Sequence, residues 1–127
     1  MQRILFNITT DTGTQGDTGQ NVHGALLQFH WNPTTPDTGA DLRLDLLPKM
    51  GDTGDGFSIF DDNDCLGVNF TRAPRQPTHD LSGAVDQTDT GTPASLSPYV
   101  FAGDRLRVKV TPGGAAVVGR LYVYLLD

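Results

Sequence analysis

The chain has 127 residues and a formal net charge of −6, a length that suits one domain able to bury about two-thirds of its unfolded surface without disulfides or metal. The acidic balance argues against a nucleic-acid or anionic-membrane partner, because both need a basic patch. Cys65 is the only cysteine, which excludes a disulfide framework and indicates a reducing cytoplasm.

The composition favours strands and turns over helices. All fifteen acidic residues are aspartate, and the lysines are Lys49 and Lys109 alone, so the strongest charged helix formers are nearly absent. Thr, Asp, Gly and Pro are frequent instead. The residues from Met1 to Asn7 turn polar too quickly for a signal peptide, and no apolar run has the length of a membrane span. We therefore expect a protein made in the cytoplasm without a targeting segment.

Two strands separated by a polar loop are predicted at the start of the chain. Arg3 to Thr9 alternates apolar and polar side chains, and Thr10 to Asn21 is expected to be a loop. Val22 to Asn32 carries apolar residues on both faces, which places it inside a sheet. We expect Pro33 and Pro36 to end this second strand.

Three more short strands follow at a spacing of about ten residues. Ala40 to Leu47 alternates leucines with charged residues, and Gly51 to Gly56 is expected to form a turn. Phe57 to Phe60 is a fourth strand, and Leu66 to Thr71 is a fifth that places Leu66, Val68 and Phe70 on one face.

Between Arg72 and Ser97 the regular spacing stops. Ala73 to Asp80 contains two prolines and is expected to be extended without a full ladder of hydrogen bonds, while Leu81 to Val85 is a weak strand or one helical turn. A connection of this length is usually functional or disordered. A segment lying against a partner subunit and a flexible surface loop are both compatible with its composition.

The best-specified stretch is the C-terminal one. Pro98 to Gly103 predicts a short strand that turns at Gly103 and Asp104 into a strict alternation from Asp104 to Val110. Thr111 to Gly114 supplies a turn, and Ala115 to Leu126 is expected to return as the second strand of a hairpin. Together these elements predict an all-β, single-domain antiparallel β-sandwich or jelly roll with long polar loops and little helix.

An Asp-Thr-Gly tripeptide occurs five times, beginning at Asp11, Asp17, Asp37, Asp52 and Asp89. The segment Asp37 to Asp41 resembles the retroviral-type aspartic protease motif, and Val117 to Arg120 is similar to that family's C-terminal apolar-apolar-Gly-Arg segment. That family requires an apolar strand directly before the aspartate, whereas Pro33 to Pro36 precedes it here. Five copies suit a turn element better, because Asp caps its own backbone and Gly tolerates positive φ.

Other candidate sites have structural explanations. Asp61 to Asp64 offers oxygens for calcium but lacks the EF-hand glycine and glutamate, so a solvated acidic turn is favoured. Cys65 has no neighbouring base and is expected to be an inert thiol. Trp31, Tyr122 and Tyr124 could stack on sugars, although core packing explains them more simply. We predict no catalytic residue, no cofactor and no metal site.

The segments Pro98 to Val110 and Gly119 to Leu125, with the turn between them, resemble the closing hairpin of small β-sandwich structural proteins of tailed bacteriophages, and are most similar to capsid decoration, or cement, proteins. The resemblance implies a non-enzymatic protein of the virion that binds the major capsid protein on the capsid surface. It also implies a homo-oligomer, dimer or trimer, that stabilises contacts between coat subunits.

If so, the polar loops are the predicted partner contacts, and their candidate residues are Thr14, Gln15, Arg72, Arg75, Pro77 and His79. One alternative is a phage tail, fibre or collar module that recognises glycan or protein. A further alternative is the aspartic protease discussed above.

Overall fold

The computed structural model describes residues 1–11, 16–47, 57–77, 82, 84–85, 87, 91 and 95–127. These residues form strands and no helix, which confirms the predicted all-β class. The strands are β1 (Gln2–Thr9), β2 (Gly16–Thr35), β3 (Asp41–Leu47), β4 (Phe57–Asp62), β5 (Phe70–Arg72), β6 (Arg75–Pro77), β7 (Leu96–Pro98), β8 (Val100–Thr111) and β9 (Val118–Leu126).

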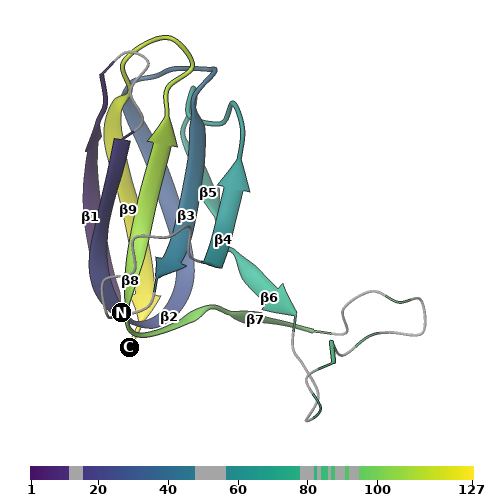
Figure 1. The fold of residues 1–127 in the computed structure, drawn as a ribbon. Helices are drawn as coiled ribbons and strands as arrows, with labels where there is room; N and C mark the ends of the chain where they lie inside the picture. Colours follow the sequence, from purple (N-terminus) through teal and green to yellow (C-terminus); the bar gives the residue numbers. More distant parts are fainter. Residues whose placement is uncertain are drawn as a thin grey trace.

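The strands pair antiparallel and fold into two layers (Figure 1). In sheet I the order is β1-β9-β2-β5, and it uses residues 25–35 of β2. In sheet II the order is β2-β8-β3-β4, and it uses residues 16–25 of β2. The 20-residue strand β2 therefore belongs to both layers and carries the chain from one to the other.

The crossing point in β2 is Gly24. The next residue, Ala25, pairs with Val100 of β8 on one side and with Leu126 of β9 on the other. Gly24 has a φ of 111°, and a methyl group added to it would lie 2.5 Å from the carbonyl oxygen of Leu126. Only glycine fits both the backbone angle and this close approach.

The core between the sheets is built from the inward side chains of alternating strands. Trp31 is fully buried at its centre and donates its indole N–H to the carbonyl oxygen of Leu66 over 3.1 Å. Gly119 of β9 lies directly against this ring, since an added Cβ would stand 2.4 Å from it. The predicted inward faces of two segments are confirmed: Ile4, Phe6 and Ile8; and Leu121, Val123 and Leu125. In β3 the prediction of Leu42, Leu44 and Leu46 as inward is correct for the first two, but Leu46 is only half-buried and Leu47 is buried instead.

The predicted C-terminal hairpin is wrong. β8 pairs with β2 and β3, and β9 pairs with β1 and β2, so β2 separates the two strands in one continuous sheet and each lies in a different layer of the fold. Residues 112–117 connect the layers as an arch. The alternation identified each strand correctly, because it shows which face of a strand is buried. It does not show whether two consecutive strands pair in one layer or face each other across the core.

Two other boundaries near these strands differ from the prediction. β8 continues through Gly103 and Asp104 without a turn, and Gly103, with φ 90°, lies where the register with β2 shifts between Asn21 and His23. The predicted loop from Thr10 to Asn21 is wrong from Gly16 onward, because residues 16–21 pair with β8. The backbone hydrogen bonds that this segment forms with the edge of β8 are sufficient to make it a strand, although it contains few apolar residues.

The second and fifth predicted strands also end elsewhere. β2 runs past Pro33 to Thr35, and Pro33 sits at a register shift where a missing N–H is tolerated. The strand predicted from Leu66 begins only at Phe70, because the preceding residues turn so that Leu66 enters the core while Val68 stays exposed. β4 extends two residues beyond its predicted end, and the predicted turn at residues 51–56 lies outside the described residues.

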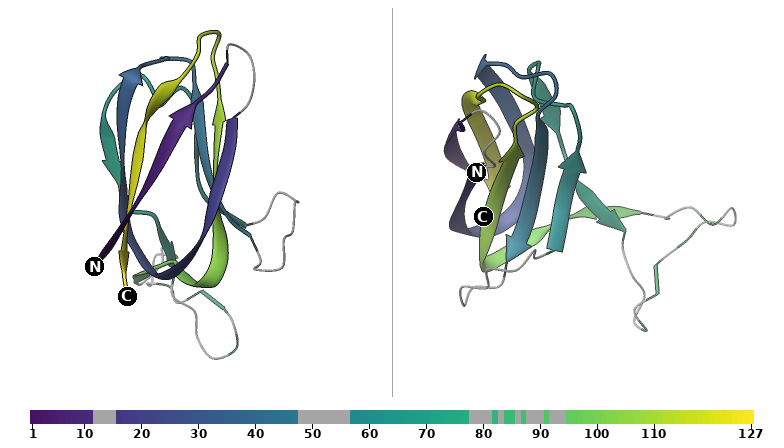
Figure 2. Two further views of the ribbon diagram at one scale, coloured as in Figure 1. Left: turned by 90° about the vertical axis from the view of Figure 1, so that its left-hand side faces the viewer. Right: turned by 45° about the horizontal axis from the view of Figure 1, so that its top comes forward.

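A small two-stranded ribbon stands away from the sandwich. β6 and β7 pair through Arg75 with Pro98, Gln76 with Ser97 and Pro77 with Leu96. Figure 2 shows this ribbon leaving one end of the sandwich, the end at which both chain termini lie. It is the described portion of the long segment predicted to be irregular between Arg72 and Ser97, and we call it the arm.

Candidate functional site

The arm contains two of the predicted partner-contact residues. The guanidinium of Arg75 donates from Nη1 to the carbonyl oxygens of Leu26 at 3.3 Å and Leu27 at 3.0 Å, so it fixes the arm to β2. Pro77 is half-buried and pairs with Leu96. Arg75 thus acts within its own chain as the anchor of the arm.

The remaining predicted contacts are separated. Arg72 is exposed at the end of β5, and its guanidinium carbon lies 5.1 Å from the ring centre of Phe70. Thr14, Gln15 and His79 lie outside the described residues. The structure therefore does not bring the six predicted residues into one described site.

The end of the sandwich at the base of the arm, and the arm itself, carry exposed apolar side chains that the sequence analysis did not single out. They come from the starts of β1, β4, β7 and β8 and from the end of β9, namely Met1, Phe57, Leu96, Val100 and Leu126. The ring centres of Phe57 and Tyr99 are 6.0 Å apart, and Leu126 and Val100 flank Ala25. We call these five residues the apolar end. Apolar side chains left exposed at one end of a domain are typical of interaction sites.

The Asp-Thr-Gly copy at Asp37 is a turn, as predicted. One carboxylate oxygen of the buried Asp37 accepts the N–H of Gly39 at 3.0 Å. The other accepts the N–H of Gly113 at 2.7 Å and of Ala115 at 3.3 Å, so Asp37 also holds the arch between β8 and β9. The Gly39 N–H and then the Gly113 N–H lower the pKa of Asp37 below its usual 3.8.

The other copies of the tripeptide differ. Residues 17–19 lie within β2, so the turn interpretation is wrong there. Asp11 follows β1 as an exposed residue, and the copies at Asp52 and Asp89 lie outside the described part of the chain.

A charged cluster missed by the sequence analysis lies in sheet II. Asp45 of β3 is fully buried, and one of its oxygens accepts from Nη2 of Arg107 at 2.9 Å. Its other oxygen accepts from Nε of Arg43 at 2.6 Å. Arg107 is nearly fully buried as well and stands opposite Asp45 in the ladder. The alternation assigns both side chains to the solvent face, and no local sequence pattern predicts that they are buried.

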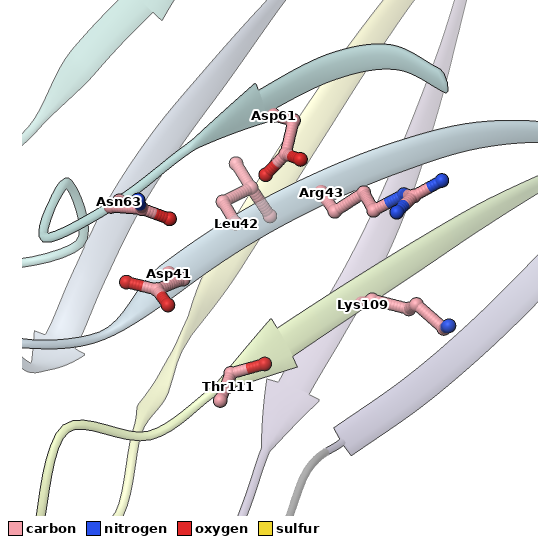
Figure 3. A pocket seen from close by; sticks show the side chains of 7 residues that line it. All are labelled: Asp41, Leu42, Arg43, Asp61, Asn63, Lys109 and Thr111. Atoms are coloured by element: carbon pink, nitrogen blue, oxygen red, sulfur yellow. The ribbon is translucent and has the colours of Figure 1, made fainter.

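A polar hollow of about 190 Å³ opens beside this cluster (Figure 3). It is lined by Asp41, Leu42, Arg43, Asp61, Asn63, Lys109 and Thr111. Asp41 accepts the N–H of Asp64 at 2.9 Å, which ties the start of β3 to the turn after β4. Within the described residues no group of three His, Cys, Asp or Glu side chains could hold a metal ion.

Cys65 lies beside the same turn and is partly buried. Its thiol donates to the carbonyl oxygen of Asp62 at 3.6 Å. Burial is the main reason that the pKa of Cys65 rises to about 11. A thiol with this pKa is almost wholly protonated at neutral pH and is a poor nucleophile, as the sequence predicted.

The three aromatic residues weighed as a sugar-stacking platform, Trp31, Tyr122 and Tyr124, are divided between core and surface. Trp31 is fully buried and faces the sandwich interior. Tyr122 and Tyr124 point the other way, are half-buried, and lie on the outer face of sheet I. The sequence shows their alternation with Leu121 and Val123, but it does not predict that β1 and β2 are the strands on either side of β9.

No family model matches the chain, and no curated protein sequence matches it either. Among the described residues there is no helix long and apolar enough to cross a membrane.

Proposed function

We propose that this chain is a virion structural protein without enzymatic activity that decorates the outside of a phage capsid. In this role it binds the major capsid protein, forms a homodimer or homotrimer, and stabilises contacts between coat subunits. The observation that carries the proposal is the arm with the apolar end around its base. The sequence resemblance described above suggests the protein class, and it rests on the sequence of the C-terminal segments alone, because β8 and β9 do not form a hairpin.

The arm suits a bridging role because it projects from the sandwich instead of packing on it (Figure 2). Arg75 anchors its base through two carbonyl groups, so its direction is set before any partner binds. A pre-positioned ribbon loses less conformational entropy on binding than a flexible tail. Repeated over many sites on a capsid, individually weak contacts of this kind add to a large effective affinity.

The apolar end suits contact with another protein chain. Val100 and Leu96 have exposed fractions of 63% and 60%, so a partner that covers them gains about 25 cal/mol for each Å² of apolar surface buried. Charged residues inserted among them would oppose burial. We therefore assign the subunit and capsid contacts to this end and to the arm.

The test combines light scattering of the purified protein with co-sedimentation on capsids assembled from the major capsid protein of the same genome. We expect a dimer or trimer that sediments with capsids at a stoichiometry comparable to the coat protein. The double variant Leu96→Asp/Val100→Asp should lose at least tenfold in capsid affinity. The control is Val68→Asp, because Val68 is 67% exposed but lies in the turn between β4 and β5, at the opposite end of the sandwich.

Two results would contradict the proposal. One is a protein that stays in the supernatant at all capsid concentrations. The other is an equal loss of binding in Val68→Asp and in the double variant, which would show that added charge, and not the apolar end, is responsible.

A further inference from the structure

The outer face of sheet I differs in charge from the rest of this acidic chain. β1, residues 25–35 of β2, β5 and β9 contain no aspartate, although the protein has fifteen acidic residues and a net charge of −6. Arg3 and Arg120 are exposed on this face. Sheet II, by contrast, carries acidic residues on β3, β4 and β8. One side of the sandwich is therefore positive in a protein that is negative overall.

The side chains of this face form rows across the sheet. The central row runs from Leu5 of β1 to Tyr122 of β9, then to His30 of β2 and Thr71 of β5. His30 and Tyr122 have ring centres 6.5 Å apart, and Nδ1 of His30 shares a hydrogen bond of 2.8 Å with the hydroxyl of Thr71. These contacts between neighbouring side chains fix the positions of the two rings on the outer face.

Two further rows flank the central one. On one side Arg3 stands opposite Tyr124, which stands opposite Gln28. On the other side Asn7 stands opposite Arg120, which stands opposite Asn32. The guanidinium carbon of Arg3 lies 5.4 Å from the ring centre of Tyr122, so this cation is stacked on an aromatic face. We call the face bearing these rows the tyrosine-arginine face.

We propose that the tyrosine-arginine face is a docking surface for an acidic protein surface. Tyr and Arg are the residues enriched at protein interfaces, while Asp, Glu and Lys are depleted there. A guanidinium stacked on a ring keeps its planar N–H edge available to a carboxylate and is already oriented for a two-point contact. The inference does not depend on the capsid proposal, since it uses another side of the molecule.

Charge decides between an acidic protein and a nucleic acid. Nucleic-acid binding needs many cations to neutralise closely spaced phosphates. The tyrosine-arginine face offers two arginines, and the net charge of −6 repels a polyanion at longer range. Two guanidinium groups among tyrosine, asparagine and glutamine side chains match a protein surface with a few carboxylates.

The experiment measures binding of a fluorescein-labelled octaglutamate peptide by fluorescence anisotropy, with an octaglutamine peptide as the neutral comparison. The test variant is Arg3→Glu/Arg120→Glu. The matched control is Arg105→Glu/Lys109→Glu on sheet II, which changes the net charge by the same −4. Arg3→Gln/Arg120→Gln serves as a second test variant should the charge reversal disturb folding. Far-UV circular dichroism checks each variant.

We expect octaglutamate to bind, octaglutamine not to bind, and the test variant to weaken binding at least tenfold while the control stays within twofold of the original protein.

Equal losses in test and control variants would mean that overall charge governs binding, and would overturn the proposal. So would an octaglutamate peptide that does not bind, or heparin that binds more tightly and displaces it. A self-association that the test variant abolishes would assign the face to a second copy and likewise overturn it. Because no capsid is used, failure here is distinguishable from failure of the proposed function.

Discussion

Replacing Gly24 by alanine tests the crossing of β2 between the sheets. At φ 111° a side chain is strained, and such strain costs about 1–3 kcal/mol in a non-glycine residue. The added methyl group would also stand 2.5 Å from the carbonyl oxygen of Leu126, so the backbone of β9 must shift. Shifts forced by overpacking cost roughly 1–3 kcal/mol more. We expect Gly24→Ala to lower the free energy of unfolding by about 2–6 kcal/mol.

The measurement is urea unfolding followed by circular dichroism, in which a slope of about 2 kcal/mol per M converts this loss into a midpoint lower by roughly 1–3 M. Gly114→Ala is the matched control, because Gly114 also has a positive φ, 128°, but nothing lies within 4 Å of an added Cβ. The difference between the two variants isolates the contact with Leu126. If Gly24→Ala costs no more than Gly114→Ala, the steric part of the reasoning is refuted.

Three more predictions concern side chains. Asp45→Asn removes a fully buried carboxylate charge that accepts from both Arg107 and Arg43, and should cost about 3–5 kcal/mol in urea unfolding, whereas Asp61→Asn at an exposed position should change stability by less than about 0.5 kcal/mol. Because the folded pKa of Asp37 lies below 3.8, its carboxylate stabilises the fold above that pH and this contribution is lost as pH falls through the lower folded value. Asp37→Asn should therefore be less stable than the original protein at pH 6, with the gap closing in thermal melts below pH 3.8; a gap that is constant with pH would contradict this. Since the pKa of Cys65 is about 11, its alkylation by iodoacetamide at pH 8.5 should be about a hundredfold slower in the folded protein than in urea, and equal rates would contradict its burial.

The elements of the fold were largely readable from the sequence, but the partners of the strands were not. Alternation identified the strands β3 and β9 and the inward residues of β9, because a half-buried strand needs a period of two. In β3 it holds only as far as Leu44, since the pairing with β4 is irregular after that residue. The same pattern cannot tell whether β8 pairs with β9 or faces it across the core. The turn residues between β8 and β9 suggested that the two strands pair. In the structure the 20-residue strand β2 is long enough to pair with β8 in one layer and with β9 in the other.

Buried charges were the main omission at the level of side chains. Asp45 and Arg107 fit the polar half of their strands, and only the register that sets them opposite each other explains how both can be covered. Asp37 was assigned to a turn correctly, yet its second role, holding the arch at Gly113, joins residues 76 positions apart. Such contacts depend on the completed topology and leave no local signature.

The passage of β2 through both sheets also bears on how the protein opens. In a sandwich whose layers share no strand, one sheet can exchange its amide hydrogens while the other stays protected. Here residues 16–25 of β2 pair with β8 in sheet II, and residues 25–35 pair with β9 in sheet I. Because one continuous strand belongs to both layers, unfolding of either layer also disturbs the strand on which the other layer depends. The two layers should consequently behave as one cooperative unit, with amides of β8 and β9 exchanging at similar rates through the same global opening.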